Sequence, residues 1–67
     1  MFIRLTESRK DDKGNNVYKG VLVNMNEVRY VQEPMKSVHT YLCLGDNKFM
    51  FVKESLEEIE KKMLTPL

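Results

Sequence analysis

The sequence predicts a small α+β domain, an antiparallel sheet of about five short strands followed by one C-terminal helix packed on one face. Short segments alternate apolar and polar residues, which is the period-two pattern of half-buried strands. Clusters of turn-forming residues separate these segments. The last segment carries apolar residues at helical spacing over several turns. At 67 residues, the chain has the length of a single domain, residues 1–67.

The first two strands are predicted to form a hairpin with a long tip. Residues 2–6, FIRLT, alternate and are expected to form an edge strand with Ile3 and Leu5 facing inward. Residues 8–16, SRKDDKGNN, are polar and rich in turn formers, so they predict a flexible hairpin loop. Residues 17–23, VYKGVLV, are expected to form the return strand.

The return strand is expected to present different residues on its two faces, because successive strand side chains point to opposite sides. One face would carry Val21 and Val23. The other face would carry Tyr18, Gly20 and Leu22.

The next segment predicts a short irregular element before a third strand. Asn24 and Asn26 are residues that cap or turn, so residues 24–27 predict one helical turn or a bulge. A strand is expected over residues 28–33. Pro34 ends it, because proline donates no hydrogen bond to a ladder.

Residues 38–44, VHTYLCL, form the clearest predicted strand. Its inward side is expected to carry Val38, Thr40, Leu42 and Leu44. Its other side is expected to carry His39, Tyr41 and Cys43. Asp46 and Asn47 tolerate left-handed backbone and predict a two-residue hairpin turn, after which residues 48–53 return as the fifth strand.

The helix is predicted to begin with a capping box at Ser55. In this motif the serine oxygen accepts the Glu58 backbone N–H, and the Glu58 carboxylate accepts the Ser55 N–H. Leu56, Ile59 and Met63 follow at helical spacing and predict a core-facing stripe.

Composition excludes several settings for this chain. Lys and Arg total 11 and Asp and Glu 10, so a net charge of +1 offers no general attraction to nucleic acid or an anionic membrane. The N-terminal segment lacks the apolar run of a signal peptide, and no apolar run approaches the roughly 20 residues that cross a bilayer. Cys43 is the only cysteine, which excludes an internal disulfide and fits a reducing compartment. We therefore expect a cytoplasmic protein without membrane insertion.

No arrangement of residues predicts a catalytic, cofactor-binding or metal site. His39 and Cys43 would lie on one strand, where their spacing spans roughly 13 Å, too far for a nucleophile and its base. The segment DDKGNN lacks the ligand spacing of a calcium loop. The acidic group Glu54, Glu57, Glu58 and Glu60 is expected to form a solvated helix face with nothing to raise a pKa. We predict a protein that is not an enzyme and binds no cofactor.

The sheet face that the helix leaves uncovered is the candidate interaction surface. It is expected to carry Tyr18, Leu22, Tyr30, Tyr41 and Cys43. Either the pair Phe49 and Phe51 or Met50 would join them. Aromatic residues and methionine are enriched at interfaces, and an apolar patch on a small protein marks a contact site. The predicted partner is another protein or a second copy, because a core this small gains from association; the alternative is a curled sheet that buries both faces itself.

A second hypothesis is a nucleic-acid-binding regulator that uses the N-terminal hairpin. Its candidate contacts are Arg4, Arg9, Lys10, Lys13 and Lys19. Tyr18 lies among them in the sequence, and basic residues combined with aromatic ones bind nucleic acid. Asp11 and Asp12 dilute this basic character, so nucleic acid is the less favoured partner.

Two families share part of this pattern. Asn24, Val28 and Val31 match N-x-x-x-I-x-x-I, and IRLT at residues 3–6 matches an opening strand. A second run, T-x-I-x-L-x-N-G-K-x-Y-x-V-K-E-S-x-E-E, is matched by Thr40, Leu42, Leu44, Lys48, Val52, Lys53, Glu54, Ser55, Glu57 and Glu58. On these residues the stretch 24–59 resembles the small flagellar FlbD/SwrD family. The resemblance implies a cytoplasmic, non-enzymatic accessory protein of bacterial motility.

This chain departs from that family at the turn, where Asp46-Asn47 replaces Asn-Gly, and in two longer loops. The same stretch is also similar to the first half of the LytTR DNA-binding domain, through VRYV at 28–31 and SLEEI at 55–59. That family continues into a further basic region that contacts DNA, which is not expected here, so this resemblance ranks second. A small phage or mobile-element protein of unassigned role on the same scaffold is the remaining alternative.

Overall fold

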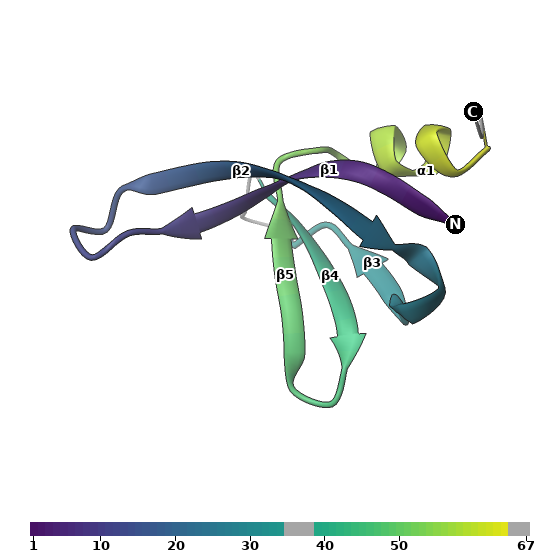
Figure 1. Cartoon of the computed structure of the whole chain (residues 1–67), viewed down its shortest axis with the longest axis horizontal. Helices are drawn as coiled ribbons and strands as arrows, with labels where there is room; N and C mark the ends of the chain where they lie inside the picture. The colour runs from purple at the N-terminus through teal and green to yellow at the C-terminus, as the bar shows by residue number, and fades with distance from the viewer. Residues whose placement is uncertain (35–38, 65–67) are drawn as a thin grey trace.

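The computed structural model describes residues 1–34 and 39–64. The elements follow in the order β1 (Phe2–Lys10), β2 (Asn16–Asn24), η1 (Met25–Glu27), β3 (Tyr30–Gln32), β4 (Thr40–Gly45), β5 (Lys48–Val52) and α1 (Leu56–Leu64) (Figure 1). All strand pairs are antiparallel, and the strands lie in the order β2-β1-β5-β4-β3 in one open sheet. The predicted α+β class, with a five-stranded antiparallel sheet and a C-terminal helix, is confirmed.

The β1–β2 hairpin is much longer than the sequence predicts. Its pairing runs from Phe2–Asn24 to Lys10–Asn16 without a register shift. The expected loop over 8–16 is therefore wrong, because its first three residues belong to β1 and Asn16 opens β2. The residues at this end of the hairpin are exposed or only half-buried, so they lack the apolar alternation that identifies a strand.

The tip of the hairpin is a turn organised by Asp11. Its carboxylate accepts the backbone N–H groups of Lys13 and Asn15, both at 2.9 Å. Gly14 adopts φ +82°, a left-handed conformation that glycine reaches without a Cβ penalty. The segment DDKGNN thus directs its first carboxylate at its own backbone.

β1 is an inner strand, which corrects its predicted place at the edge. It lies between β2 and β5. Glu7 pairs with Val52 and Ser8 with Phe51, and the Lys53 N–H donates to the Thr6 carbonyl at 2.8 Å. The edges of the sheet are β2 and β3.

The helical turn predicted at 24–27 is confirmed as η1. The Asn24 side-chain oxygen accepts the Asn26 N–H at 3.1 Å and caps the turn. The following strand is shorter than the predicted 28–33, because Val28 still caps η1.

The turn predicted at Asp46 and Asn47 joins β4 to β5, and Asn47 adopts φ 57°. Gly45 adopts φ +118°, and a register shift between Cys43 and Gly45 marks a bulge before the turn. Val38, predicted to begin this strand, lies outside the described residues.

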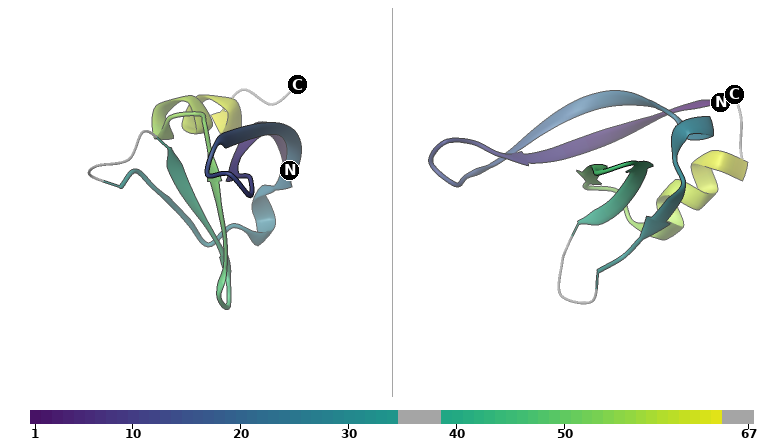
Figure 2. Two further views of the ribbon diagram at one scale, coloured as in Figure 1. Left: turned by 90° about the vertical axis from the view of Figure 1, so that its left-hand side faces the viewer. Right: turned by 90° about the horizontal axis from the view of Figure 1, so that it is seen from below.

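The core forms where the hairpin crosses the end of the β3–β4–β5 meander (Figures 1 and 2). Its buried apolar residues are Ile3, Leu5, Val23, Leu42, Val52 and Ile59. Ile3 and Leu5 therefore face inward as predicted. Thr40 is also buried, and its hydroxyl donates to the Glu54 carbonyl at 2.6 Å.

Helix α1 begins with the predicted capping box. The Glu58 N–H donates to the Ser55 hydroxyl at 3.1 Å, and the Ser55 N–H donates to the Glu58 carboxylate at 3.3 Å. The predicted core stripe is only partly right: Ile59 is 1% exposed, whereas Leu56 and Met63 are 39% and 40% exposed. The helix has nine residues and lies at one end of the meander (Figure 1), so only its central turn reaches the core.

Candidate functional site

The face of the sheet opposite the core, here called the outer face, carries the residues that alternate with the buried ones. One cross-strand row runs through all strands and contains Tyr18, Ser8, Phe51, Tyr41 and Gln32. The neighbouring row contains Phe49, Cys43 and Tyr30. Leu22, which is paired with Arg4, lies on the same face of the hairpin. The register therefore places all the predicted interaction residues on one face.

Tyr41 is the centre of an aromatic cluster on the outer face, formed by Tyr30, Tyr41, Phe49 and Phe51. Its ring centroid lies 5.5 Å from that of Phe51 and 5.7 Å from that of Phe49. The Tyr30 ring lies 6.1 Å from Tyr41 on its other side. Phe49 and Phe51 meet edge to face at 5.9 Å. Rings at these separations attract one another, so the cluster presents a defined surface.

Much of the outer face remains open to solvent. The exposed fractions are 52% for Tyr30, 58% for Phe49, 46% for Tyr18 and 65% for Leu22. Phe49 and Phe51 join this face, whereas Met50 packs against the core. Exposed fractions of this size do not fit a curled sheet that buries both of its faces.

Two shallow depressions flank the aromatic cluster. One, of about 420 Å³, is lined by Tyr41, Cys43, Gly45, Asn47, Lys48 and Phe49. The other, of about 600 Å³, is lined by Ser8, Arg9, Lys10, Asn16, His39 and Phe51. A hydrogen bond with Cys43 raises the pKa of the Tyr30 phenol, so this hydroxyl is neutral at physiological pH. Rings beside neutral and basic polar groups form a surface that accommodates partner side chains.

His39 and Cys43 have different neighbours on the outer face. The His39 Nε2 lies 3.2 Å from the Ser8 hydroxyl, and its ring lies 6.2 Å from that of Tyr18. Cys43 lies between Tyr30 and Phe49 in its row. Along the chain, Tyr41 and its cross-strand row lie between His39 and Cys43. The thiol and the imidazole are therefore not placed to act as a pair.

Glu54 makes a contact that sequence reasoning missed. It was expected on the solvated helix face, but its carboxylate accepts the Thr6 backbone N–H at 2.8 Å and the Thr6 hydroxyl at 2.9 Å. Partial burial acts to raise the pKa of Glu54, but these hydrogen bonds outweigh it and hold the pKa below its ordinary value. The two residues are 48 apart in sequence, so no local pattern could have paired them.

The five basic residues of the nucleic-acid hypothesis do not gather on one face. Strand alternation places Arg4 and Lys10 on the outer face, and Arg9 and Lys19 on the opposite one. Arg9 forms an ion pair with Glu7 at 3.2 Å, and Lys19 is paired with Glu7 across the hairpin.

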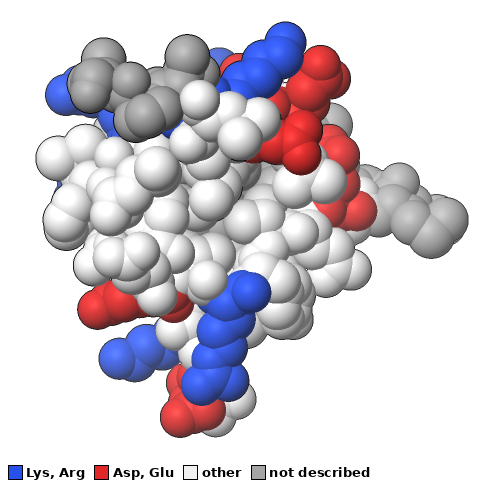
Figure 3. All heavy atoms as spheres, turned by 90° about the vertical axis from the view of Figure 1, so that its right-hand side faces the viewer, with Lys and Arg blue, Asp and Glu red and all other residues white. Residues whose placement is uncertain are grey.

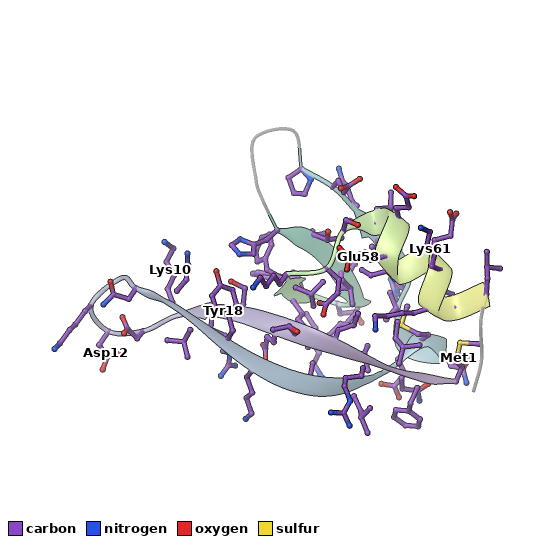
Figure 4. The ribbon with its side chains drawn as sticks, turned by 90° about the horizontal axis from the view of Figure 1, so that it is seen from above. Met1, Lys10, Asp12, Tyr18, Glu58 and Lys61 are labelled. Atoms are coloured by element: carbon purple, nitrogen blue, oxygen red, sulfur yellow. The ribbon has the colours of Figure 1, made fainter. Side chains whose placement is uncertain are left out.

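Charges of both signs are mixed over the surface around these residues. Lys13 lies in the tip turn next to Asp12, which Figure 4 shows at the far end of the hairpin from α1. Asp11 at the tip, and Glu7 beside Arg9 and Lys19, therefore interrupt the basic residues of the hairpin. Figure 3 shows the side of the molecule that faces away from the hairpin tip, where acidic and basic side chains both lie near the upper and lower ends.

Within residues 1–34 and 39–64, no group of three or more His, Cys, Asp or Glu side chains is arranged to hold a metal ion. None of the described helices has the length and apolar character to cross a membrane. No family model, curated protein or solved structure matches this chain.

Proposed function

We propose that this protein is a small, non-enzymatic interaction module that contacts a protein partner through the aromatic cluster of its outer face. The observation that carries this proposal is the exposure of Tyr30 and Phe49, each more than half open to solvent, on a face with supporting rings beneath them. Leaving such rings in water costs free energy that a partner recovers by covering them.

Site-specific photocrosslinking in the living cell tests this proposal. Phe49 is replaced by benzoylphenylalanine, which keeps an aromatic ring at the exposed position. Glu60, exposed on α1, receives the same group in the control protein. We expect a discrete covalent adduct from position 49 and none from position 60. The mass of the adduct distinguishes a second copy from a different protein.

A second substitution links the adduct to the cluster itself. Tyr41→Glu introduces a charge at the centre of the rings and should abolish the adduct from position 49, with the circular dichroism spectrum unchanged. Equal adducts from both positions, or an adduct that survives Tyr41→Glu in a folded protein, would show that the cluster is not the contact surface.

The biological setting follows the FlbD/SwrD resemblance, which supports an accessory role in bacterial motility. This role predicts that deleting the gene reduces swarming, that the wild-type chain restores it, and that Tyr41→Glu does not. Normal swarming of the deletion strain would dismiss the motility role while leaving the contact surface to be judged by crosslinking.

A nucleic-acid-binding regulator is the second candidate, favoured by two observations. The Lys53 Nζ lies 5.1 Å from the centroid of the Tyr18 ring, and the larger depression nearby is lined by Arg9 and Lys10. Such a site predicts binding of single-stranded DNA that weakens steeply with salt. Fluorescence anisotropy at low salt checks it, and an unchanged signal up to high protein concentration excludes this candidate.

A further inference from the structure

The two edges of the sheet differ in how well they are protected. Exposed edges attract other strands unless they are short, charged, bulged or interrupted by proline. β3 has three residues and is followed closely by Pro34. β2 has nine residues, pairs with β1 without a bulge, contains no proline, and carries Lys19 as its one charged residue. β2 therefore lacks the protection that β3 has.

The hydrogen bonds at both ends of the hairpin establish which backbone groups of β2 are free. In an antiparallel pair, residues alternate between exchanging both hydrogen bonds with their partner and pointing these groups away. The Met25 N–H donates to the Met1 carbonyl, and the Asp11 N–H donates to the Asn15 carbonyl, both at 2.9 Å. Odd-numbered residues of β2 therefore bond to β1. The even-numbered ones, Asn16, Tyr18, Gly20, Leu22 and Asn24, direct their N–H and C=O groups to the free edge.

We propose that this free edge of β2 pairs with β2 of a second copy, antiparallel, about a two-fold axis at Gly20. Gly20 is the middle residue of the strand, so this register uses the full length of β2. Tyr18 then lies opposite Leu22 of the partner subunit, and the central glycine lies opposite Gly20 of the partner subunit. The outward N–H groups of these residues then donate to the outward C=O groups of the facing strand, and the reverse holds for their own C=O groups.

Side chains are complementary in this register. Tyr18 and Leu22 project on the outer face and are 46% and 65% exposed, and each covers the other across the axis. On the opposite face, Lys19 meets Val21 of the partner subunit rather than a like charge. Glu7 stands beside Lys19 in the hairpin and offsets its charge. A Cβ on Gly20 would meet nothing within 4 Å in the single chain, so no side chain of this chain covers the outer face at the axis.

The pairing of two β2 strands extends the proposed function. Its functional consequence, a bivalent binding surface, rests on that proposed function. A two-fold axis between antiparallel strands is perpendicular to the sheet, so the outer faces of both copies point to the same side. The two aromatic clusters would then form one bivalent surface on a continuous sheet. Pairing also adds stability to a domain whose own core is small.

Hydrogen exchange of the whole chain tests the pairing without any substitution. The N–H groups of Tyr18, Gly20 and Leu22 should exchange rapidly at micromolar concentration and become protected at millimolar concentration. Those of Lys19 and Val21, which bond to β1, should be protected at both. Exchange at Gly20 that is rapid at every concentration, or new protection confined to β4 and β5, would overturn the proposal.

A charge exchange tests the register. Tyr18→Glu and Leu22→Lys should each weaken dimerisation by about tenfold, because the two-fold symmetry makes each Tyr18–Leu22 contact occur twice in the dimer. The double variant places the introduced carboxylate of one copy opposite the introduced ammonium of the other and should restore the dimer. Within one chain these positions are roughly 13 Å apart, so an internal ion pair does not explain a rescue. Sedimentation measures the dimer, and circular dichroism verifies folding. A folded double variant no better than the single ones contradicts this register.

Tyr41→Glu separates this proposal from the proposed function. It alters the aromatic cluster but lies on β4 and not on β2, so it should leave the dimer intact while abolishing the adduct from position 49. Loss of the dimer in folded Tyr41→Glu would instead place self-association on the aromatic cluster and exclude the β2 edge.

Discussion

The two faces of this sheet are built from alternate residues of the same strands, yet they differ in what covers them. In β4, Leu42 is fully buried, while its neighbour Cys43 lies on the outer face. In β5, Val52 is fully buried, while Phe49 is 58% exposed. The hairpin and α1 close over one face, and the described elements leave the aromatic cluster of the other in solvent.

This difference teaches that the apolar residues of the two faces have separate tasks. Burial removes the core residues from water and stabilises the fold directly. The exposed rings contact one another but keep much of their surface in water, so they contribute less to folding and remain available to a partner. Substitutions that affect the two faces unequally therefore test the division.

The largest effect is expected from Leu42→Ala. The side chain is fully buried, so its truncation should lower the free energy of unfolding by about 2–5 kcal/mol. Cys43→Ala, the adjacent residue on the outer face, should lower it by less than about 1 kcal/mol. Urea denaturation measures both, and equal losses would show that the two faces are not energetically distinct.

Glu54→Gln should have the next largest effect, because Glu54 holds β1 against the segment before α1. Replacing a charged acceptor of two hydrogen bonds should cost about 1–2 kcal/mol at neutral pH. Because the folded-state pKa is depressed, this contribution is complete above the unfolded pKa near 4.5 and is lost as the pH falls through the lower folded value.

The stability difference between wild type and Glu54→Gln should therefore shrink below pH 4.5. Urea denaturation across this range checks the sign. Glu57→Gln is the control. The Glu57 carboxylate is exposed on α1, and its ion pair with Lys61 at 3.5 Å is also exposed. A difference that grows on acidification would contradict the assigned role.

Ser55→Ala should destabilise the helix that closes the core face. Losing the cap leaves the Glu58 N–H without its acceptor, and such losses cost about 0.5–2 kcal/mol. Ser55→Gly should cost only a few tenths of a kcal/mol. Thermal denaturation compares them, and a larger loss for glycine than for alanine would argue against the capping interaction.

The smallest effect is expected between Lys53 and Tyr18 on the outer face. A double-mutant cycle with Lys53→Ala and Tyr18→Leu should give a coupling of about 0.5–1 kcal/mol, typical of an exposed cation over a ring. A coupling of several kcal/mol would mean that the outer face also holds the fold together, which would weaken the distinction between the faces.

The sequence predicted the fold class and the faces well because both depend on local periodicity. Alternation placed Ile3 and Leu5 inward, and the Ser55–Glu58 spacing predicted the cap that is present. It failed where polar residues form a strand. The sequence of residues 8–10 predicted a loop, because neither side of that part of the hairpin is buried. In the structure these residues pair with Tyr18, Val17 and Asn16, respectively.

The sequence by itself determined which side chains share a face, since strand geometry sends successive residues to opposite sides. Only the tertiary structure decided which strands are neighbours. That choice made β1 an inner strand, left β2 as a long free edge, and brought the Glu54 carboxylate to Thr6 across 48 residues. Pairing between distant segments depends on how the whole chain packs around its core, and local periodicity does not predict which strands will pair.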